Sequence, residues 1–330
     1  MQQINDAFVL GIKHRKVRKK FRIIFFSMIT ILVLFVLFTT IQKGRYFFPD
    51  KEYRHQTFNK RIPENHLFAN EVVHFKNQTA YRDFYNELKL NTQQNKSTTL
   101  VLKDASIWLP VIEKILKQHN VPSDFKYVAM VESNFRNLVS NKNAVGFWQL
   151  KEATALELGL EINDEVDERY DPIRSTYAAS RFFKQAYRQF GSWTVTAAAY
   201  NRGMGGISRA FDKQNASDYY DLNLNKETSR YIYKLLAVKD MVEHPRKYGL
   251  RMYRWERERV RTLKVTEDIE DLNDYAIKNG TSLYVLKLYN PWLLSNTLTI
   301  KEKGASYTIE LPYPRPKVKK DSVIVAKENI

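Results

Sequence analysis

The chain has 330 residues, 44% of them hydrophobic, which is enough for a sizeable core and about two domains. It contains no cysteine, so disulfides, thiol nucleophiles and thiolate metal sites are excluded. Its net charge of +17 is spread along the sequence, apart from a basic excess in residues 1–22. No nucleic-acid partner is therefore predicted, and an anionic polymer or membrane surface suits the bias at least as well.

The N-terminal region predicts a membrane anchor. Residues 23–41 are apolar and uncharged, long enough to cross a hydrocarbon core of about 30 Å. The alternative is a cleaved signal peptide, but the small residues of a cleavage site are missing after the apolar segment. By the positive-inside rule, we expect the basic residues 1–22 in the cytoplasm and the rest of the chain outside a single-pass inner-membrane helix.

Residues 42–104 are polar and aromatic, with only patchy periodicity. Tyr81, Phe84, Tyr85 and Leu88 predict one helical face. No motif in this region indicates chemistry, so we interpret it as a packing arm or spacer between the membrane and the next domain.

Residues 105–250 predict a mainly α domain, because one helical pattern follows another. Residues 201–206, which are rich in glycine, are interpreted as a turn. The expected helices are one through Trp108 and Leu116 with Pro110 near its start, then 153–158, 175–190, 193–200 capped by Ser192, and 227–242.

The stretch 121–150 organises this domain. Pro122 and Ser123 are expected to begin a helix, with the serine as its cap. Phe125, Val128, Ala129 and Glu132 follow at the spacing of one apolar helix face. Burial raises the pKa of such a glutamate and keeps it protonated near neutral pH, as a general acid requires. The alternative is that Glu132 ends the helix and turns to water.

The C-terminal part predicts a small β-α-α-β module at residues 264–311. It follows a charged connector, 251–263, and precedes a flexible tail, 312–330. Its elements are a strand at Val265, a helix through Ile269, Leu272 and Ala276, a helix capped by Ser282, and strands at 298–300 and 307–311.

Four motifs carry a family resemblance. They are Glu132-Ser133, Gly146-Phe147-Trp148-Gln149, Ala199-Tyr200-Asn201, and Tyr231 after a Glu-Thr pair. In this order, they make residues 105–250 resemble the lytic transglycosylase domain of glycoside hydrolase family 23. The resemblance implies a lysozyme-like helical fold. It also implies that the protein lies in the cell envelope and acts on peptidoglycan glycan strands. It further implies cleavage between N-acetylmuramic acid and N-acetylglucosamine, attack by the C6 hydroxyl and a 1,6-anhydro product. No cofactor or metal is predicted.

The resemblance implies that Glu132 is catalytic and that the other motif residues bind substrate. Ser133 is expected to hydrogen-bond Glu132 or an N-acetyl group. The alternative is that it caps the C-terminal turn of the helix. Gly146 would let the backbone approach the sugar, or serve only as a turn glycine. Gln149 would bind sugar amides, or be an ordinary loop residue. Trp148 is expected in the core.

Tyr200 and Asn201 would position the muramic acid, with a core tyrosine and a helix cap as the alternatives. Tyr231 lies on the apolar face of its helix, where packing is the simplest role. Its phenol could also reach Glu132 and tune the carboxyl group.

Ordinary glycosidases need two carboxylates beside the scissile bond. No acidic residue follows Glu132 before Glu152, although Asp167 and Asp171 stay candidates. One carboxyl group suffices if the substrate supplies its own nucleophile. A muramidase-type hydrolase of the same fold and an inactive wall-binding scaffold are the alternative functions.

The C-terminal module weakly resembles LysM, a peptidoglycan-binding unit. The usual Gly-Asp-Thr of its first loop is replaced by Thr266-Glu267-Asp268, and Asn290 is followed by Pro291. Glycan binding and a structural cap on the catalytic domain are therefore equal alternatives for this module.

Overall fold

The computed structural model describes residues 66–93, 96–302 and 304–313. The expected basic segment 1–22, the anchor at 23–41 and all but the first two residues of the tail 312–330 lie outside this range. None of the helices in the described ranges combines the length and apolar character that crossing a membrane requires.

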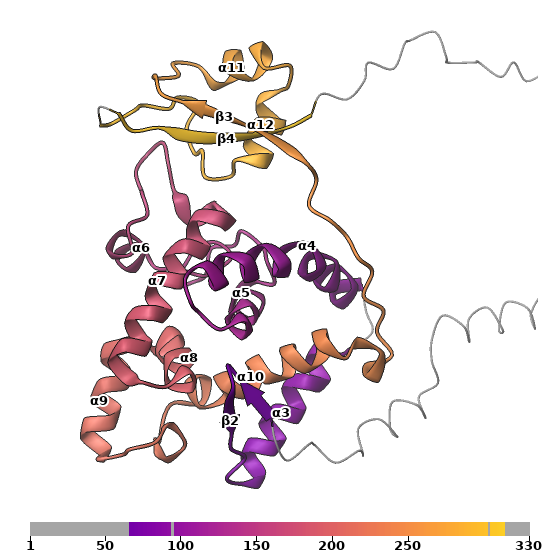
Figure 1. The fold of residues 1–330 in the computed structure, drawn as a ribbon, viewed down its shortest axis with the longest axis vertical. Helices are drawn as coiled ribbons and strands as arrows, with labels where there is room; N and C mark the ends of the chain where they lie inside the picture. The colour runs from indigo at the N-terminus through magenta and orange to yellow at the C-terminus, as the bar shows by residue number, and fades with distance from the viewer. Residues whose placement is uncertain (1–65, 94–95, 303, 314–330) are drawn as a thin grey trace, which may run out of the picture. The chain divides into compact units, whose positions relative to one another are not determined.

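The described part of the expected arm is folded. A short antiparallel pair, β1 (His66–Phe68) and β2 (Glu71–Val73), leads into helix α3 (Gln78–Asn91). Helix α3 lies beside α10 (Lys226–Glu243), as Figure 1 shows, with Phe84 and Leu88 buried. Helix packing is therefore one role of this region.

Helix α4 (Lys96–Gln118) runs across the expected boundary between residues 104 and 105. The prediction that Pro110 lies near the start of this helix is wrong, because Pro110 lies inside it. The apolar face of α4 stabilises the helix on both sides of the proline, with Leu109, Ile112 and Leu116 buried.

The central stretch begins with a 3-10 turn, η1 (Ser123–Phe125), which continues into α5 (Lys126–Ser133). The expected Ser123 cap is wrong, since no side chain caps this turn. Phe125, Val128 and Ala129 are fully buried, as their spacing predicted. A left-handed Asn134 ends α5 directly after the Glu-Ser pair.

The remaining helices of this domain follow in close succession, joined by short loops. Asp171 and Ser192 cap α7 and α8 with their side chains. The predicted turn at 201–206 is wrong, because α8 runs through Arg202 and only Gly203, with φ +85°, separates it from α9. The elements are α6 (Glu152–Glu157), η2 (Glu168–Tyr170), α7 (Pro172–Phe190), α8 (Trp193–Arg202), α9 (Met204–Gln214), η3 (Tyr219–Asp221), α10, and η4 (Pro245–Tyr248).

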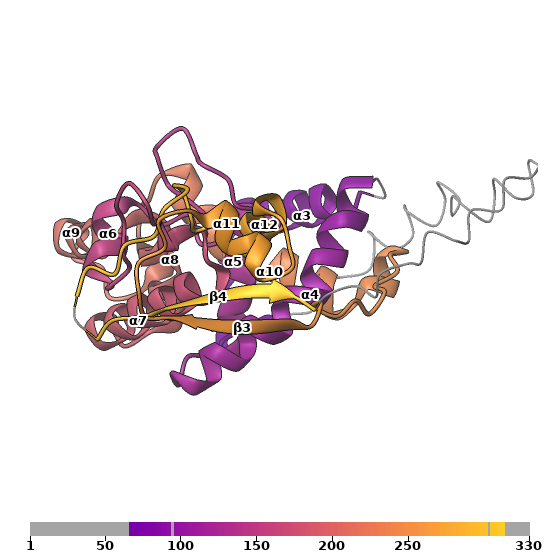
Figure 2. The ribbon, with the colours of Figure 1, turned by 90° about the horizontal axis from the view of Figure 1, so that it is seen from above.

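The C-terminal module has the predicted β-α-α-β order. Strands β3 (Val260–Val265) and β4 (Tyr307–Pro312) pair antiparallel. Helices α11 (Leu272–Lys278) and α12 (Leu283–Tyr289) lie next to each other beside this pair (Figure 2). The predicted strand at 298–300 is wrong, since Leu298 forms only an isolated bridge to Ile269. The described protein is therefore mainly helical, with one small β-containing module.

Candidate active site

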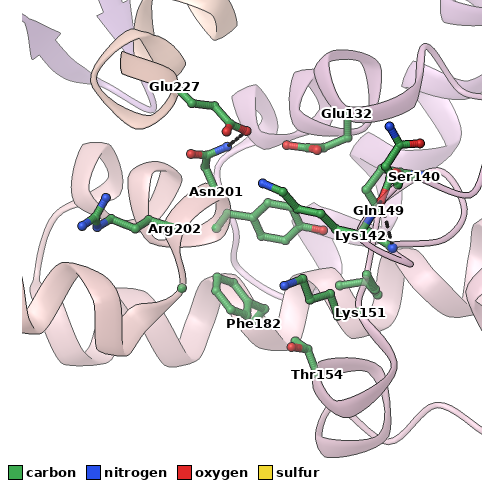
Figure 3. A pocket seen from close by; sticks show the side chains of 15 residues that line it. Glu132, Ser140, Lys142, Gln149, Lys151, Thr154, Phe182, Asn201, Arg202 and Glu227 are labelled. Atoms are coloured by element: carbon green, nitrogen blue, oxygen red, sulfur yellow. Dashed lines mark hydrogen bonds between the residues drawn. The ribbon is translucent and has the colours of Figure 1, made fainter. Parts of the chain in front are cut away.

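A cavity of about 610 Å³ opens in the helical domain. Its walls come from the end of α5, the loop between α5 and α6, and helices α7, α8 and α10. Figure 3 shows the carboxyl group of Glu132 pointing into it, toward Asn201 and Glu227. Lys142 and Lys151 also line the cavity, so two acids and several cations share one space.

The Glu132 side chain is partly exposed because it faces the cavity. Burial of its carboxyl group by the surrounding protein raises its pKa, and the negative charge of Glu227 acts in the same direction. A hydrogen bond from Tyr231 Oη to Glu132 Oε1, at 2.6 Å, and the charge of Lys234 limit the rise. The raised pKa favours the protonated acid, while the Tyr231 hydrogen bond and the charge of Lys234 stabilise the carboxylate after it loses its proton.

The Ser133 hydroxyl bonds to backbone carbonyl oxygens, and Ser133 is not among the residues that line the cavity. It is buried, and its hydroxyl lies 2.8 Å from the Phe147 carbonyl oxygen and 3.1 Å from that of Ala129. The bond to Phe147 joins the end of α5 to the loop that carries Gln149. Ser133 therefore positions this loop relative to Glu132.

The Gly-x-x-Gln loop is held by contacts with backbone carbonyl oxygens. Gly146 has φ +80°, and a Cβ atom there would lie 2.0 Å from the Arg169 carbonyl oxygen. Protein backbone thus excludes any Cβ atom at Gly146, and the approach of this backbone to sugar stays a prediction. Gln149 lines the cavity, and its Nε2 donates to the carbonyl oxygens of Leu138 and Gly146 at 3.0 and 2.9 Å.

Tyr200 and Asn201 line the cavity from the end of α8. The Tyr200 hydroxyl donates to the Trp148 carbonyl oxygen at 2.6 Å, and burial raises its pKa well above the usual range. Asn201 accepts a bond from Thr228 Oγ1 at 2.8 Å and donates to Glu227 Oε1 at 3.3 Å. Both side chains are fixed by protein contacts, which suits a rigid wall.

Neither aspartate considered as a second carboxylate lines the cavity. Asp167 is buried in a bidentate pair with Arg169, and Asp171 caps α7. The second carboxylate of the cavity is Glu227, which sequence reasoning missed. Its signal was its position four residues before Tyr231, which places both on one face of α10.

Trp148 is fully buried, as predicted, and its indole N–H donates to Thr176 Oγ1 at 2.9 Å. Within the described ranges, no group of three or more His, Asp or Glu side chains could hold a metal ion.

The comparisons with known proteins confirm the predicted resemblance. Residues 110–223 match the family model described as Transglycosylase SLT domain, and residues 261–315 match Soluble lytic transglycosylase C-terminal LysM-like domain. The first match ends before Glu227 and Tyr231, so contacts to Asn201 and Glu132 place those two residues at the site.

Several curated proteins are similar to this chain. Two are named Membrane-bound lytic murein transglycosylase D, from Escherichia coli K12 and O6:H1, each 29% identical over 246 residues, or 72% of this chain and 54% of the relative. A Putative tributyltin chloride resistance protein from an Alteromonas species is 34% identical over 108 residues, 32% of this chain and 52% of the relative. The chain spans about half the length of the curated relatives it matches.

Proposed function

We propose that this chain is a peptidoglycan lytic transglycosylase that cleaves the β-1,4 bond between N-acetylmuramic acid and N-acetylglucosamine. The observation that carries the proposal is the partly buried Glu132 carboxyl group, bonded to Tyr231 and facing a cavity of about 610 Å³. The two matched domain types and the printed names of the E. coli relatives support it.

In the proposed reaction, Glu132 donates its proton to the glycosidic oxygen as the bond from C1 to that oxygen breaks. The N-acetylglucosamine leaves with a 4-hydroxyl group, and the substrate's N-acetyl group assists at C1. The muramic C6 hydroxyl then bonds to C1, and its proton returns to the Glu132 carboxylate. The product has a 1,6-anhydro end, no water is consumed, and the enzyme regains its starting protonation.

Tyr231 and Lys234 stabilise Glu132 after it has given up its proton. Both favour the charged carboxylate that exists between the two proton transfers. The Tyr231 hydroxyl at 2.6 Å also fixes Oε1, which orients the carboxyl group in the cavity. Substrate binding by Gln149, Tyr200 and Asn201 stays a prediction, supported by their position in the cavity wall.

A second candidate is a muramidase-type hydrolase, and Glu227 is the observation that favours it. This carboxylate lines the same cavity, where it could activate a water molecule. Glu227 Oε1 already accepts a hydrogen bond from Asn201 Nδ2, which competes with the activation of water by that atom. We favour the transglycosylase because Glu227 Oε1 already accepts from Asn201, the charge of Glu227 raises the pKa of Glu132, and the E. coli relatives are named transglycosylases.

The deciding experiment is digestion of purified peptidoglycan, followed by mass spectrometry of the fragments. We expect 1,6-anhydromuramic acid ends, absent with Glu132→Gln. Fragments about 18 mass units heavier, from one added water, would establish a hydrolase, and Glu227→Gln should then abolish the product. Intact binding without fragments would favour an inactive scaffold.

We also propose that residues 23–41 anchor the protein in the inner membrane, with the catalytic domain in the periplasm. The relatives' printed names support envelope association. Protease added outside spheroplasts should digest residues 66–313 and leave a small membrane-bound fragment. Complete protection of the catalytic domain would contradict this topology.

Within the catalytic unit we include residues 66–104. Helix α4 crosses residue 104 without interruption, and Glu71 accepts hydrogen bonds from Ser192 Oγ, Trp193 N and Thr194 N at the start of α8.

A further inference from the structure

The C-terminal module is joined to the catalytic domain by residues 161–168, here called the docking hairpin. It connects α6 to η2 and projects Glu165 and Val166 at its tip. Asn163 stiffens the hairpin, because its Oδ1 accepts from the Glu165 and Val166 amides at 2.8 and 3.0 Å. The base is closed by a bond from the Glu168 amide to the Glu161 carbonyl oxygen, at 3.0 Å. Such a hairpin has a defined shape before it meets the module.

Backbone bonds dock the hairpin on the segment between α12 and β4. The Leu294 amide donates to the Glu165 carbonyl oxygen at 2.8 Å, and the Asp167 amide donates to that of Trp292 at 3.0 Å. Val166 forms a bridge with Leu293 between these two bonds. The hairpin thus adds a short extended segment to the module, a mode of association that depends on main-chain hydrogen bonds.

Side chains strengthen the same contact. The Glu165 carboxylate accepts bonds from Thr297 Oγ1 and from the Thr299 amide, the latter at 2.9 Å. Val166 is 1% exposed and belongs to the hydrophobic core of the module, although its sequence position is in the catalytic domain. Glu161 accepts a bond from Tyr307 Oη at 2.9 Å. A shared core makes independent movement of the two domains unfavourable.

The docking hairpin leads directly to residues that contact the Gly-x-x-Gln loop, here called the catalytic loop (residues 146–150). It is followed by Arg169, whose carbonyl oxygen occupies the space where any Cβ atom at Gly146 would lie. The next residue, Tyr170, accepts a hydrogen bond from Asn137 Nδ2 at 2.9 Å. Gly146 in turn accepts from the side chain of Gln149, which lines the cavity. Packed contacts therefore run without a gap from the module to the site.

We propose that the C-terminal module is a positioning element of the catalytic loop, acting through Glu165 and Val166 on the backbone at Gly146 to Leu150. Residues 292–299 are occupied by the docking hairpin, so this face of the module is not free to bind glycan. The structure thereby favours the structural-cap interpretation of the module over independent glycan binding. Any effect on catalysis rests on the function proposed above, whereas the effect on the loop does not.

The test is hydrogen–deuterium exchange of the whole chain, compared with the double variant Glu165→Ala/Val166→Ala. The Gly146 and Leu150 amides form backbone bonds to the Leu138 and Val145 carbonyl oxygens, and their exchange reports on the loop. Loss of docking should speed exchange at residues 292–299 and, by about fivefold or more, at residues 145–150. Asp164→Asn, at the exposed neighbouring position, is the matched control and should change neither segment.

Faster exchange at 292–299 with an unchanged loop at 145–150 would overturn the proposal. No change in either segment would also overturn it, since Glu165 and Val166 would then not hold the docked arrangement. If the double variant does not fold, Thr297→Val removes the same carboxylate contact from the module side. Peptidoglycan digestion by the same variants should show a lower kcat with a smaller change in KM. If the unmodified chain is inactive on peptidoglycan, the proposed function is refuted, whereas the exchange result still stands.

Discussion

The hydrogen bond between Tyr231 and Glu132 makes the sharpest prediction for the substitution Tyr231→Phe. Tyr231 is 3% exposed, so phenylalanine keeps the packing of the ring and removes only the hydroxyl. The lost bond, 2.6 Å long, reaches the carboxyl group that is charged between the two proton transfers of the proposed reaction. A hydrogen bond to a charged group contributes about 1.5–3 kcal/mol, which corresponds to a loss of roughly 10- to 150-fold in kcat.

The pH profile of activity gives a second, independent test of the Tyr231 hydrogen bond. Activity falls on the alkaline side as the general acid ionises. Because the Tyr231 bond lowers the pKa of Glu132, its removal raises that pKa, and the alkaline limb should move to higher pH. KM should change little, since Tyr231 is not among the residues that line the cavity.

The assay is the rate of soluble fragment release from peptidoglycan between pH 5 and pH 10. The control is Tyr233→Phe on the same helix, which removes a bond to the His74 carbonyl oxygen away from the cavity. This control should leave kcat and the pH profile unchanged. A folded Tyr231→Phe protein with normal kcat, or with its alkaline limb unmoved, would refute the role assigned to this bond.

Three further substitutions test the site and its supports. Burial raises the pKa of Glu132, so the folded state loses stability as pH rises through that pKa. Glu132→Gln removes this ionisation and should therefore raise Tm at neutral and alkaline pH. Near pH 4 the variant and the unmodified chain should have similar Tm values. Gly146→Ala should cost more than about 2 kcal/mol of unfolding free energy in urea, because the added Cβ meets the Arg169 carbonyl oxygen at a left-handed φ; a cost below 0.5 kcal/mol would contradict this packing. Glu71→Gln should lower the unfolding free energy by about 1–3 kcal/mol by weakening bonds to the first turn of α8, and an unchanged urea midpoint would argue against them.

Local sequence signals predicted most of the helices. Ser192 and Gly191 mark a cap and a helix end that depend only on neighbouring backbone, and both occur where expected. The apolar spacing of Phe125, Val128 and Ala129 predicted a buried face, because helix periodicity places such residues together in any fold. The same spacing placed Glu132 at the edge of that face, where partial burial raises its pKa.

Local signals failed where distant contacts compete with them. Pro110 predicts a helix start, but packing of the apolar face of α4 holds the helix through it. The glycines after Asn201 predict a turn, yet Gly205 and Gly206 lie in α9, where buried Ile207 and Ala210 hold that helix against the domain. Residues 298–300 predict a strand, but Leu298 forms an isolated bridge to Ile269 and the Thr299 amide donates to the Glu165 carboxylate.

The sequence by itself determined the helical class and the order of the C-terminal module, because these depend on residue type and short-range periodicity, and its four motifs singled out Glu132 as the proposed general acid. Only the tertiary structure decided that Ser133 and Gly146 position the loop at residues 146–150, that Glu227 shares the cavity with Glu132, and that Val166 lies in the core of the module. Each of these facts depends on residues far apart in the chain that meet only after folding. Hydrogen bonding and close packing act through distance in space, which one sequence does not record.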